Sequence, residues 1–410
     1  MSEVVIILIF YLVTKIVLDL MQIYTIKTAS IDPVSVKLLD INNDNDAKSR
    51  AYNISKLNLS VIRSLLYVGW IYFLLFGGLI KQINLTLETL NFSYYLINLY
   101  TILISYILIH ITMVVLSFYS TFMIEAKYEF NTSSKLLFIK DNIISLIMTL
   151  VLITLISTVF FYLVPYKDFW WILMASIIFF MIIVSIYIYP TYISPIFNKF
   201  KNLEDEEIEN EIKDLSDKTN FSIENLYVMD KSKRSKHPNA YFTGFRKNRR
   251  IVFYDTLIEL LSPREVKAVL AHEIGHYKLN HIKQSLILST CVIFIGMFFL
   301  SQLVNNNNYL EMLNLSFNVS SQLLALIFTY QIVSFFIDPI FSILSRKNEY
   351  EADKFASEQV DKVYLISSLI KLYKENLTFL KPNKLYAMVY FSHPTVLERI
   401  NMLRCNNEKS

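Results

Sequence analysis

Apolar residues along this chain gather in seven long stretches that are separated by polar segments. A helix needs about 20 mostly apolar residues to cross a bilayer. Six stretches meet that length with few charges: 61–80, 93–119, 143–164, 169–189, 285–304 and 321–344. The seventh, residues 4–24, is also apolar but carries Lys15 and Asp19. The pattern predicts a polytopic membrane protein with about seven transmembrane helices.

The charged pair in the first stretch leaves two interpretations open. Lys15 and Asp19 are four residues apart, so they share one face of a helix and can pair with each other. Charged side chains inside a span usually face a water-filled interior. Equally, the pair can mark a ragged end of the span. The stretch lacks a basic start and a small-residue cleavage site, which excludes a cleavable signal peptide.

Basic residues between the stretches indicate the orientation. The segments after the first, third and fifth stretches and the C-terminal tail are rich in Lys and Arg, whereas the other segments hold only Lys81 and Lys167. Cytoplasmic loops of membrane proteins carry the excess of basic residues. We therefore expect the N-terminus outside or in a lumen and the C-terminus in the cytosol, in a bacterial inner membrane or the endoplasmic reticulum membrane.

Composition agrees with a membrane protein and excludes other classes. Of the 410 residues, 54% are hydrophobic and only 18% are charged, against about a quarter charged in soluble domains. The net charge of +4 is small, and no basic cluster interleaves with aromatic residues, so nucleic-acid binding is not expected. The two cysteines, Cys291 and Cys405, form neither a disulfide framework nor a thiolate metal site.

A polar segment, residues 198–283, separates the fifth and sixth stretches. Leu203–Lys218 has an acidic helical pattern, and residues 225–229 and 250–254 have the composition of short strands. Residues 262–265 read Ser-Pro-Arg-Glu, a capping box with proline at the first helical position. The segment therefore predicts a small α+β unit in which a second helix begins at residue 263.

The sequence His272-Glu273-Ile274-Gly275-His276 lies about three turns into that second helix. At about 100° per residue, His272 and His276 are roughly 40° apart and project from one face. Two imidazoles placed in this way suit a tetrahedral zinc ion, and Glu273 is near enough to act as a base on water. A solvated surface helix is the alternative, but three of the six histidines fall within ten residues and Val269–Ala271 predicts partial burial. The motif predicts a zinc peptidase.

A third histidine, His281, follows the motif. On a continuous helix it would lie about 140° beyond His276 and face away from the metal. We therefore exclude His281 from the metal site and interpret it as an interface or capping residue.

A catalytic zinc site needs a third protein ligand and one open position. The best candidates follow the seventh stretch, where Glu349 and Asp353 are four residues apart on a predicted helix. One carboxylate can ligate zinc while the other accepts a hydrogen bond from a ligating imidazole. The alternative interpretation is that these charged residues are simply exposed to solvent at the start of a helix. Glu351, which lies on a different face, fits this alternative.

Taken together, these residues resemble the type I CAAX prenyl protease family, zinc endopeptidases of the endoplasmic reticulum and of bacterial membranes. The resemblance covers nearly the whole chain. The matching segments are Phe122–Glu125, Glu129–Asn131, Trp170–Trp171, Tyr189–Pro190, Ser194–Phe200, Ser235–Gly244, Ala271–His276, Asn348–Asp353, Ser392–Pro394 and Glu398–Arg399. Two departures are mild, because Glu351 occupies a variable position and no endoplasmic-reticulum retrieval signal ends the chain.

The resemblance implies roles for particular residues. It implies Glu349 as the third zinc ligand and Asp353 as a partner of the ligands. It also implies that Asn239 and Ala240 begin an edge strand along which the substrate lies extended, a mode that supplies main-chain hydrogen bonds. His393 and Arg399 would be donors beside the metal that stabilise an oxyanion, although a helix-capping pair is the other interpretation.

The expected fold class is an all-α polytopic membrane protein with a cytosolic zincin-type α+β catalytic domain. The resemblance adds that the seven helices enclose a chamber with the zinc site at its cytosolic end. We predict an N-terminal membrane domain with five helices (1–197), a catalytic segment (198–283), helices six and seven (284–345) and a C-terminal catalytic segment (346–410).

The expected function is zinc-dependent hydrolysis of peptide bonds, with one Zn²⁺ per chain. The resemblance implies prenylated C-terminal Cys-a-a-X peptides as substrates, cut to remove the last three residues, and membrane lipid as the surroundings. A bacterial heat-shock type quality-control protease shares the zinc motif and remains an alternative, although fewer spans precede its motif. A site-2 protease fits less well because its motif lies within an apolar span. A transporter or receptor with a relict zinc site would not need Glu273.

Overall fold

Seven long helices confirm the fold class in the computed structural model, which describes residues 3–166, 168–221, 226–243 and 250–405. Each of the seven is long and apolar enough to cross a membrane. They are α1 (Glu3–Thr28), α3 (Asn43–Leu75), α5 (Tyr94–Tyr119, continued by the π-helical η1, Ser120–Glu125), α6 (Lys135–Leu163), α7 (Trp170–Ile188, continued by η2, Tyr189–Ile193, and α8, Ser194–Phe197), α12 (His281–Val304) and α14 (Val319–Gln359).

These seven helices pack in a closed ring. In the order α1, α3, α5, α6, α7, α12 and α14, each helix contacts the next. Aromatic side chains connect the last helix, α14, with the first, α1. Phe336 stacks on Phe10, and Phe335 meets Tyr11 edge to face. A closed ring is the arrangement that the predicted enclosure by seven helices requires.

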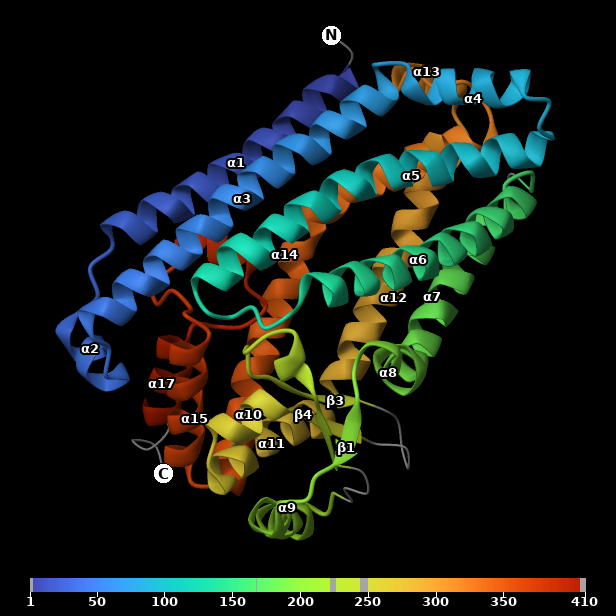
Figure 1. Cartoon of the computed structure of the whole chain (residues 1–410). Coiled ribbons are helices and arrows are strands. Elements are labelled where there is room, and N and C mark those ends of the chain that lie inside the picture. The colour runs from blue at the N-terminus through green and yellow to red at the C-terminus, as the bar shows by residue number, and fades with distance from the viewer. Residues whose placement is uncertain (1–2, 167, 222–225, 244–249, 406–410) are drawn as a thin grey trace.

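The end of the ring near the N-terminus is sealed by a hydrophobic core. Short helices α4 (Leu79–Thr89) and α13 (Asn307–Met312) lie there together, far from the sheet (Figure 1). Trp170, Phe160 and Leu310 are fully buried in this core. The sequence pattern predicted only polar connections at these places. Polar residues interrupt α4 and α13, so neither segment forms a long apolar run that would predict a helix.

A four-stranded sheet lies at the opposite end, beside the C-terminal helices (Figure 1). Its strands are β1 (Phe200–Asn202), β2 (Leu226–Met229), β3 (Ala240–Thr243) and β4 (Arg250–Tyr254), in the order β1-β2-β4-β3. β2 runs parallel to β4, and β3 pairs antiparallel with β4, with Ala240 opposite Phe253. β3 is therefore an edge strand. The pattern at 250–254 predicted β4, and the pattern at 225–229 predicted β2, apart from residue 225, which lies outside the described residues.

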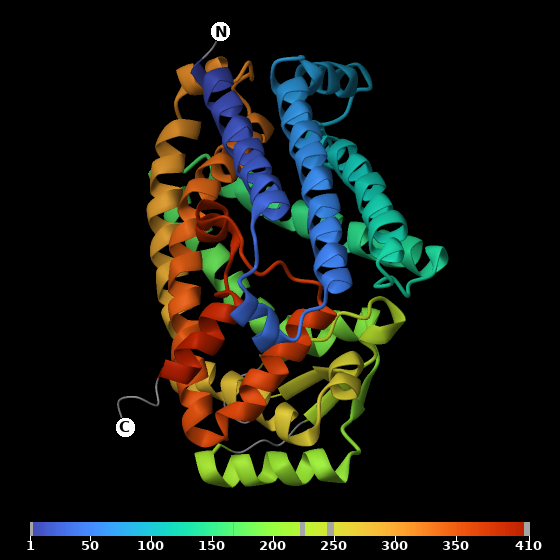
Figure 2. The same cartoon turned by 90° about the vertical axis from the view of Figure 1, so that its left-hand side faces the viewer.

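Further helices complete the catalytic half, and of these α10 and α11 contact the sheet. They are α2 (Pro33–Leu39), α9 (Glu206–Thr219), the 3₁₀ turn η3 (Lys231–Lys233), α10 (Asp255–Leu260), α11 (Pro263–Lys278), α15 (Lys362–Glu375), α16 (Lys384–Tyr390) and α17 (Val396–Cys405). α9 lies at the end farthest from the N-terminus in both views (Figure 2). α14 runs unbroken through residues 345 and 346, where we placed a boundary between two segments.

Helix α11 is the centre of the catalytic half. It packs against α9, α14, α15 and β3. Val266, Leu270 and Ile274 on its inner face are fully buried, and burying each aliphatic side chain contributes about 1.5–3 kcal/mol. Burial of this face holds the helix in place, while His272, Glu273 and His276 line a cavity.

The start of α11 is fastened to α15. The predicted capping box is present, with Glu265 Oε2 accepting from the Ser262 backbone N–H at 2.8 Å. Glu265 also accepts from the Ser367 hydroxyl and the Lys371 ammonium, each at 2.6 Å. One buried carboxylate therefore fixes both the beginning of the helix and its position against its neighbour.

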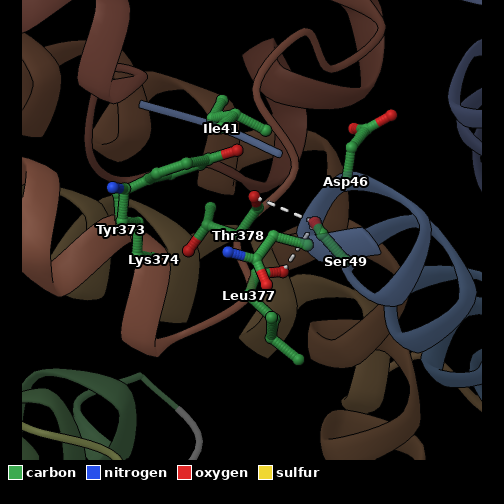
Figure 3. Close-up of a pocket in the computed structure, with 8 residues that line it drawn as sticks. Ile41, Asp46, Ser49, Tyr373, Lys374, Leu377 and Thr378 are labelled. Carbon is green, nitrogen blue, oxygen red and sulfur yellow. Dashed lines mark hydrogen bonds between the residues drawn. The ribbon is translucent and has the colours of Figure 1, made fainter. Parts of the chain in front are cut away.

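Helix α3 extends well beyond its apolar part and joins the membrane helices to the catalytic half. The Ser49 hydroxyl lies 3.0 Å and 3.1 Å from the carbonyl oxygens of Leu377 and Thr378 in the loop after α15 (Figure 3). The Asn53 amide also donates to the Leu377 carbonyl at 2.8 Å. The cavity beside these residues is about 20 Å³, room for a water molecule and too small for a peptide.

Candidate active site

The two helices that carry the candidate ligands approach each other closely. Gly275 of α11 faces Ala352 of α14 at the crossing, where a Cβ atom on Gly275 would lie 3.1 Å from Ala352 Cα and 3.2 Å from Ala352 O. Glycine permits this approach because it has no side chain. The crossing places one turn of each helix, carrying His272 and His276 on α11 and Glu349 on α14, face to face.

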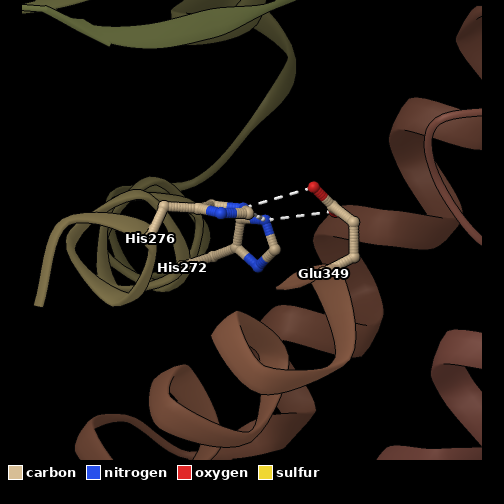
Figure 4. Close-up of side chains that lie close together, drawn as sticks. All are labelled: His272, His276 and Glu349. Carbon is tan, nitrogen blue, oxygen red and sulfur yellow. Dashed lines mark hydrogen bonds and ion pairs between the residues drawn. The ribbon is translucent and has the colours of Figure 1, made fainter. Parts of the chain in front are cut away.

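Three ligand atoms converge at this crossing (Figure 4). His272 Nε2 and His276 Nε2 are 3.1 Å apart, as the spacing along one helix predicted. Glu349 extends its carboxylate toward both rings, with Oε1 at 3.2 Å from His276 Nε2 and Oε2 at 3.4 Å from His272 Nε2. Within the described residues, this is the cluster of three His, Cys, Asp or Glu side chains with metal-binding geometry.

The chemistry of these groups fits a metal ion. Glu349 is only 4% exposed, and its Oε2 atom has no hydrogen-bond partner within the described residues, only ion-pair contacts of 3.4 Å. A buried carboxylate oxygen without such a partner is costly. A cation between the three ligand atoms would satisfy it.

Asp353 lies behind His272, one turn along α14 from Glu349. Asp353 Oδ1 is 2.9 Å from His272 Nδ1, so it can accept the proton of that nitrogen and leave Nε2 free for a metal. Arg399 of α17 donates to both oxygens of Asp353, from Nε at 2.7 Å and from Nη2 at 2.6 Å. This bidentate pair fixes the carboxylate, and through it the imidazole.

The electrostatics around His272 favour its charged form when no metal is bound. Burial alone would lower its pKa, but the hydrogen bonds with Asp353 and Glu349 outweigh that effect and raise the pKa of His272 to about 9. The carboxylates that prepare the site for a cation therefore also attract a proton.

Glu273 lies beside the ligands with its carboxylate in the cleft. Burial raises the pKa of Glu273 above its ordinary value of 4.5, although the neighbouring His272 and His276 act in the opposite direction. Its carboxylate makes no hydrogen bond with the described residues, so it can accept a proton from another molecule. A raised pKa brings a general base closer to neutral pH, where proton transfer is most efficient.

His393 reaches the site from the loop before α17. His393 Nε2 is 3.3 Å from Glu349 Oε1, and its side chain is 62% exposed, so one edge of the ring is open to the cleft. The Ser392 hydroxyl lies 2.8 Å from Nδ1. His393 therefore has a free approach to a bound molecule, whereas Arg399 is largely engaged by Asp353.

The predicted edge strand borders the same cleft. Asn239 and Ala240 line a cavity of about 430 Å³ together with the ligands, Glu273, His393 and Arg399. A second cavity of about 400 Å³ continues past Glu273 and His276 between α7, α12 and α14. Among the described residues no strand pairs with the outer edge of β3, so an extended peptide can add to it and pass the metal ligands.

Comparison with known proteins agrees with this geometry. The profile described as peptidase family M48 matches residues 202–406, and the profile described as CAAX prenyl protease N-terminal, five membrane helices, matches residues 22–199. The Arabidopsis thaliana protein named CAAX prenyl protease 1 homolog is 31% identical over 96% of this chain and 95% of its own. CAAX prenyl protease 1 of Saccharomyces cerevisiae is 35% identical over 72% of this chain and 69% of its own.

The chain belongs to the CAAX prenyl protease branch of peptidase family M48. The crystal structure of S. mikatae Ste24p has the same fold, with a TM-score of 0.88, 28% identity and 97% of each chain covered. This M48 peptidase is a membrane metalloendopeptidase, as the sequence predicted, and the family implies a catalytic metal.

His281 corrects the sequence-based interpretation. Asn280 adopts a left-handed conformation with φ of 59°, which ends α11 and starts α12 at His281. The assumption of one continuous helix was therefore wrong. The turn brings His281 Nδ1 to 3.0 Å from His276 Nδ1, and Glu351, which we interpreted as solvated, lies 3.1 Å from His281 Nε2.

A second network was missed because its members are far apart in the sequence. His237 Nδ1 lies 2.6 Å from Asn376 Oδ1, and His237 Nε2 lies 3.4 Å from Glu125 Oε2. The His237 ring also stacks on Phe130. These contacts tie the residues just before Asn239 to the membrane helices. Glu125 and His237 both lie in segments that match the family, which was the available signal.

The close crossing at Gly275 predicts a sensitive position in this M48 peptidase. In Gly275→Ala, the added Cβ meets backbone atoms of Ala352, which cannot move independently, so α11 and α14 must separate. We expect metal affinity to fall about tenfold and the free energy of unfolding to fall by about 1–3 kcal/mol. Chelator competition and thermal unfolding measure the two effects. Gly296→Ala in α12 is the control, because a Cβ at that position would meet no described atom within 4 Å outside its own stretch of helix. Equal results for the two variants would contradict the prediction.

The raised pKa of His272 predicts how metal binding depends on pH. A ligating imidazole must be neutral, so below pH 9 the metal must displace a proton from His272. Affinity should therefore rise with pH, about tenfold per unit between pH 6 and 8. An imidazole with its ordinary pKa of about 6.5 would instead give weaker binding only below about pH 6. Calorimetry in buffers of different protonation enthalpy should show about one proton released per metal at pH 7; no release would mean that His272 is already neutral.

Proposed function

We propose that this M48 peptidase uses zinc to hydrolyse the C-terminal peptide of prenylated CAAX-type proteins. The observation that carries the proposal is the convergence in one cleft of a three-ligand metal site, a base and β3, the edge strand of the described sheet. Two relatives that align with this chain over nearly their whole length are named CAAX prenyl protease 1 homologs. Their names support this substrate class over internal cleavage of damaged membrane proteins.

Zinc fits the ligand set and its spacing. Zinc binds imidazole nitrogen and carboxylate oxygen at about 2.0–2.2 Å, so the ligand atoms of a tetrahedral site lie about 3.3–3.6 Å apart. The three separations here are 3.1, 3.2 and 3.4 Å. His272, His276 and Glu349 would hold the ion and leave a fourth position open. When bound, zinc polarises a carbonyl group and lowers the pKa of water.

Three side chains of the protein would carry out the other steps of hydrolysis. Glu273 takes a proton from the attacking water and returns it to the leaving amine, because its carboxylate faces the cleft without a hydrogen-bond donor from the described residues. His393 stabilises the developing oxyanion from the exposed edge of its ring. Arg399 holds Asp353 in place, and its Nη1 atom, 3.4 Å from Glu349 Oε2, balances the negative charge of the site.

Asn239 and Ala240 would position the substrate. The Asn239 carbonyl accepts from the Tyr254 backbone N–H at 2.9 Å, which holds the start of the strand on its neighbour. An extended peptide on the other edge of β3 gains main-chain hydrogen bonds that do not depend on its side chains. A strand edge therefore fixes the scissile bond, while the cavities on either side select the residues.

We further propose that the site faces the cytosol and the N-terminus faces the outside or a lumen. The support is twofold. The basic segments lie on the same side as the sheet, and α12 and α14 form a hairpin whose outer connection, α13, lies at the opposite end of the molecule (Figure 1). Both catalytic pieces therefore emerge on one face of the membrane, and only the seven long helices would contact lipid.

The test is cleavage of a peptide that ends in farnesylated cysteine and three further residues. The purified, zinc-loaded protein in detergent should release the intact tripeptide, identified by mass spectrometry, and should act more slowly on the same peptide without the farnesyl group. In sealed vesicles, a lipid-anchored substrate should be cut only when it is on the cytosolic face. Absence of tripeptide release, or internal cuts in unfolded membrane proteins instead, would overturn the proposal.

A further inference from the structure

A row of polar side chains continues from His276 away from the other ligands. His276 Nδ1 lies 3.0 Å from His281 Nδ1, and His281 Nε2 lies 3.1 Å from Glu351 Oε2. Glu351 Oε1 is in turn 3.7 Å from the Lys347 ammonium. His281 is only 3% exposed, whereas the Glu351 and Lys347 side chains are 40% and 72% exposed. The row therefore runs from the metal site to the surface.

The proton positions in this row follow from the hydrogen-bonding roles. His276 Nε2 faces His272 and Glu349, so it must keep its lone pair if it is to bind a metal. The ring proton then resides on Nδ1, which donates to His281 Nδ1. His281 must in consequence carry its proton on Nε2, and that group donates to the Glu351 carboxylate. In this arrangement every donor meets an acceptor.

We propose that His281 and Glu351 are positioning residues that hold His276 in its metal-binding tautomer and orientation. The inference rests on the proposed function in so far as His276 is a ligand. Ligating histidines commonly donate their second N–H to a carboxylate, directly or through another group. His272 does so directly to Asp353, and His276 does so through one additional imidazole, so the two ligands are fixed by separate carboxylates on α14.

His281 is not a fourth ligand. It contacts Nδ1 of His276, on the opposite side of the ring from the nitrogen that faces Glu349. A purely structural role, fastening the start of α12 to α11, is the competing explanation. The two explanations differ in what they predict for the metal-bound and metal-free forms, because a positioning residue acts on metal retention whereas a structural one acts on both forms equally.

The variants separate these explanations. His281→Phe keeps the ring and removes both hydrogen bonds, Glu351→Ala removes the terminal acceptor, and Glu351→Gln keeps an acceptor for His281. Glu358→Ala, an exposed glutamate on the same helix, is the matched control. Each full-length protein is loaded with zinc in detergent, and the rate of zinc loss to an excess of chelator is measured together with the unfolding temperature of the metal-free form.

We expect zinc loss to be about 10–100-fold faster in His281→Phe and about tenfold faster in Glu351→Ala. Glu351→Gln should stay within about threefold of the unmodified protein, and the control should not change. Zinc loss in both His281→Phe and Glu351→Ala at the control's rate would overturn the inference, as would a lower unfolding temperature of the metal-free form without faster zinc loss. If His281→Phe does not fold, Glu351→Ala, altered at a partly exposed site, decides alone. An unmodified protein that binds no zinc would instead refute the proposed function.

Discussion

Peptide hydrolysis should fall by a factor of about 10²–10⁴ when Glu273 is replaced with glutamine, the range that a general base contributes. The amide has nearly the same shape as the carboxylate but lacks the basic oxygen that takes the proton from water. Glu273 lies in the cleft beside His272 and His276 without being one of the converging ligands. The metal should therefore stay bound at one ion per chain, and the fold should not change.

Turnover of the farnesylated peptide and metal content, measured on the same preparation, test this expectation. Glu209→Gln on α9 is a suitable control, because Glu209 is exposed and distant from the cleft. Near-normal turnover by Glu273→Gln would remove Glu273 from the role of base. Loss of metal in the same variant would show that its carboxylate helps to hold the ion.

The membrane half of the fold was predictable because its signal is local. Each span is a run of apolar residues whose length is set by the bilayer, and the seven stretches found in the sequence became seven helices. The apolar pattern did not reveal helical segments that are rich in polar residues. α3 begins at Asn43, well before its apolar part near residue 61, because residues 43–60 pack against the catalytic half rather than lipid.

The site was predictable to the extent that one helix carries it. The convergence of His272 and His276 follows from their separation of four residues, and the start of α11 follows from the capping box. The position of Glu349 depends on how α14 crosses α11, which no local pattern encodes. The sequence offered Glu349 as a candidate, and only the family resemblance singled it out.

The structure also differs from the sequence-based prediction at one turn and in the carboxylate that one arginine binds. The position of His281 depends on a left-handed residue, Asn280, which helical extrapolation could not include. Arg399 was expected beside an oxyanion, but two of its nitrogens bind Asp353. The sequence shows that an arginine is present, but tertiary packing determines which carboxylate lies next to it.

Replacing Glu349 with glutamine should weaken metal binding as well as catalysis. The amide oxygen is a poorer ligand than a carboxylate, and the site loses the negative charge that offsets the cation. Arg399 and His393, at 3.4 Å and 3.3 Å from the Glu349 oxygens, would also lose their partner. Because loss of a direct ligand should exceed the 10–100-fold effect of its supporting residues, we expect affinity to fall more than about 100-fold.

Comparing Glu349→Gln with Glu273→Gln separates ligand from base. Both should be inactive at ordinary zinc concentrations, but only Glu349→Gln should recover part of its activity when zinc is raised. Metal content after dialysis should be near zero for Glu349→Gln and near one for Glu273→Gln. The contrast also tests the hairpin of α12 and α14, because Glu349 can act on a metal held by α11 only if both helices emerge on one side of the membrane. Full metal retention in Glu349→Gln would contradict its role as ligand and leave the ion held by the two histidines and some other group.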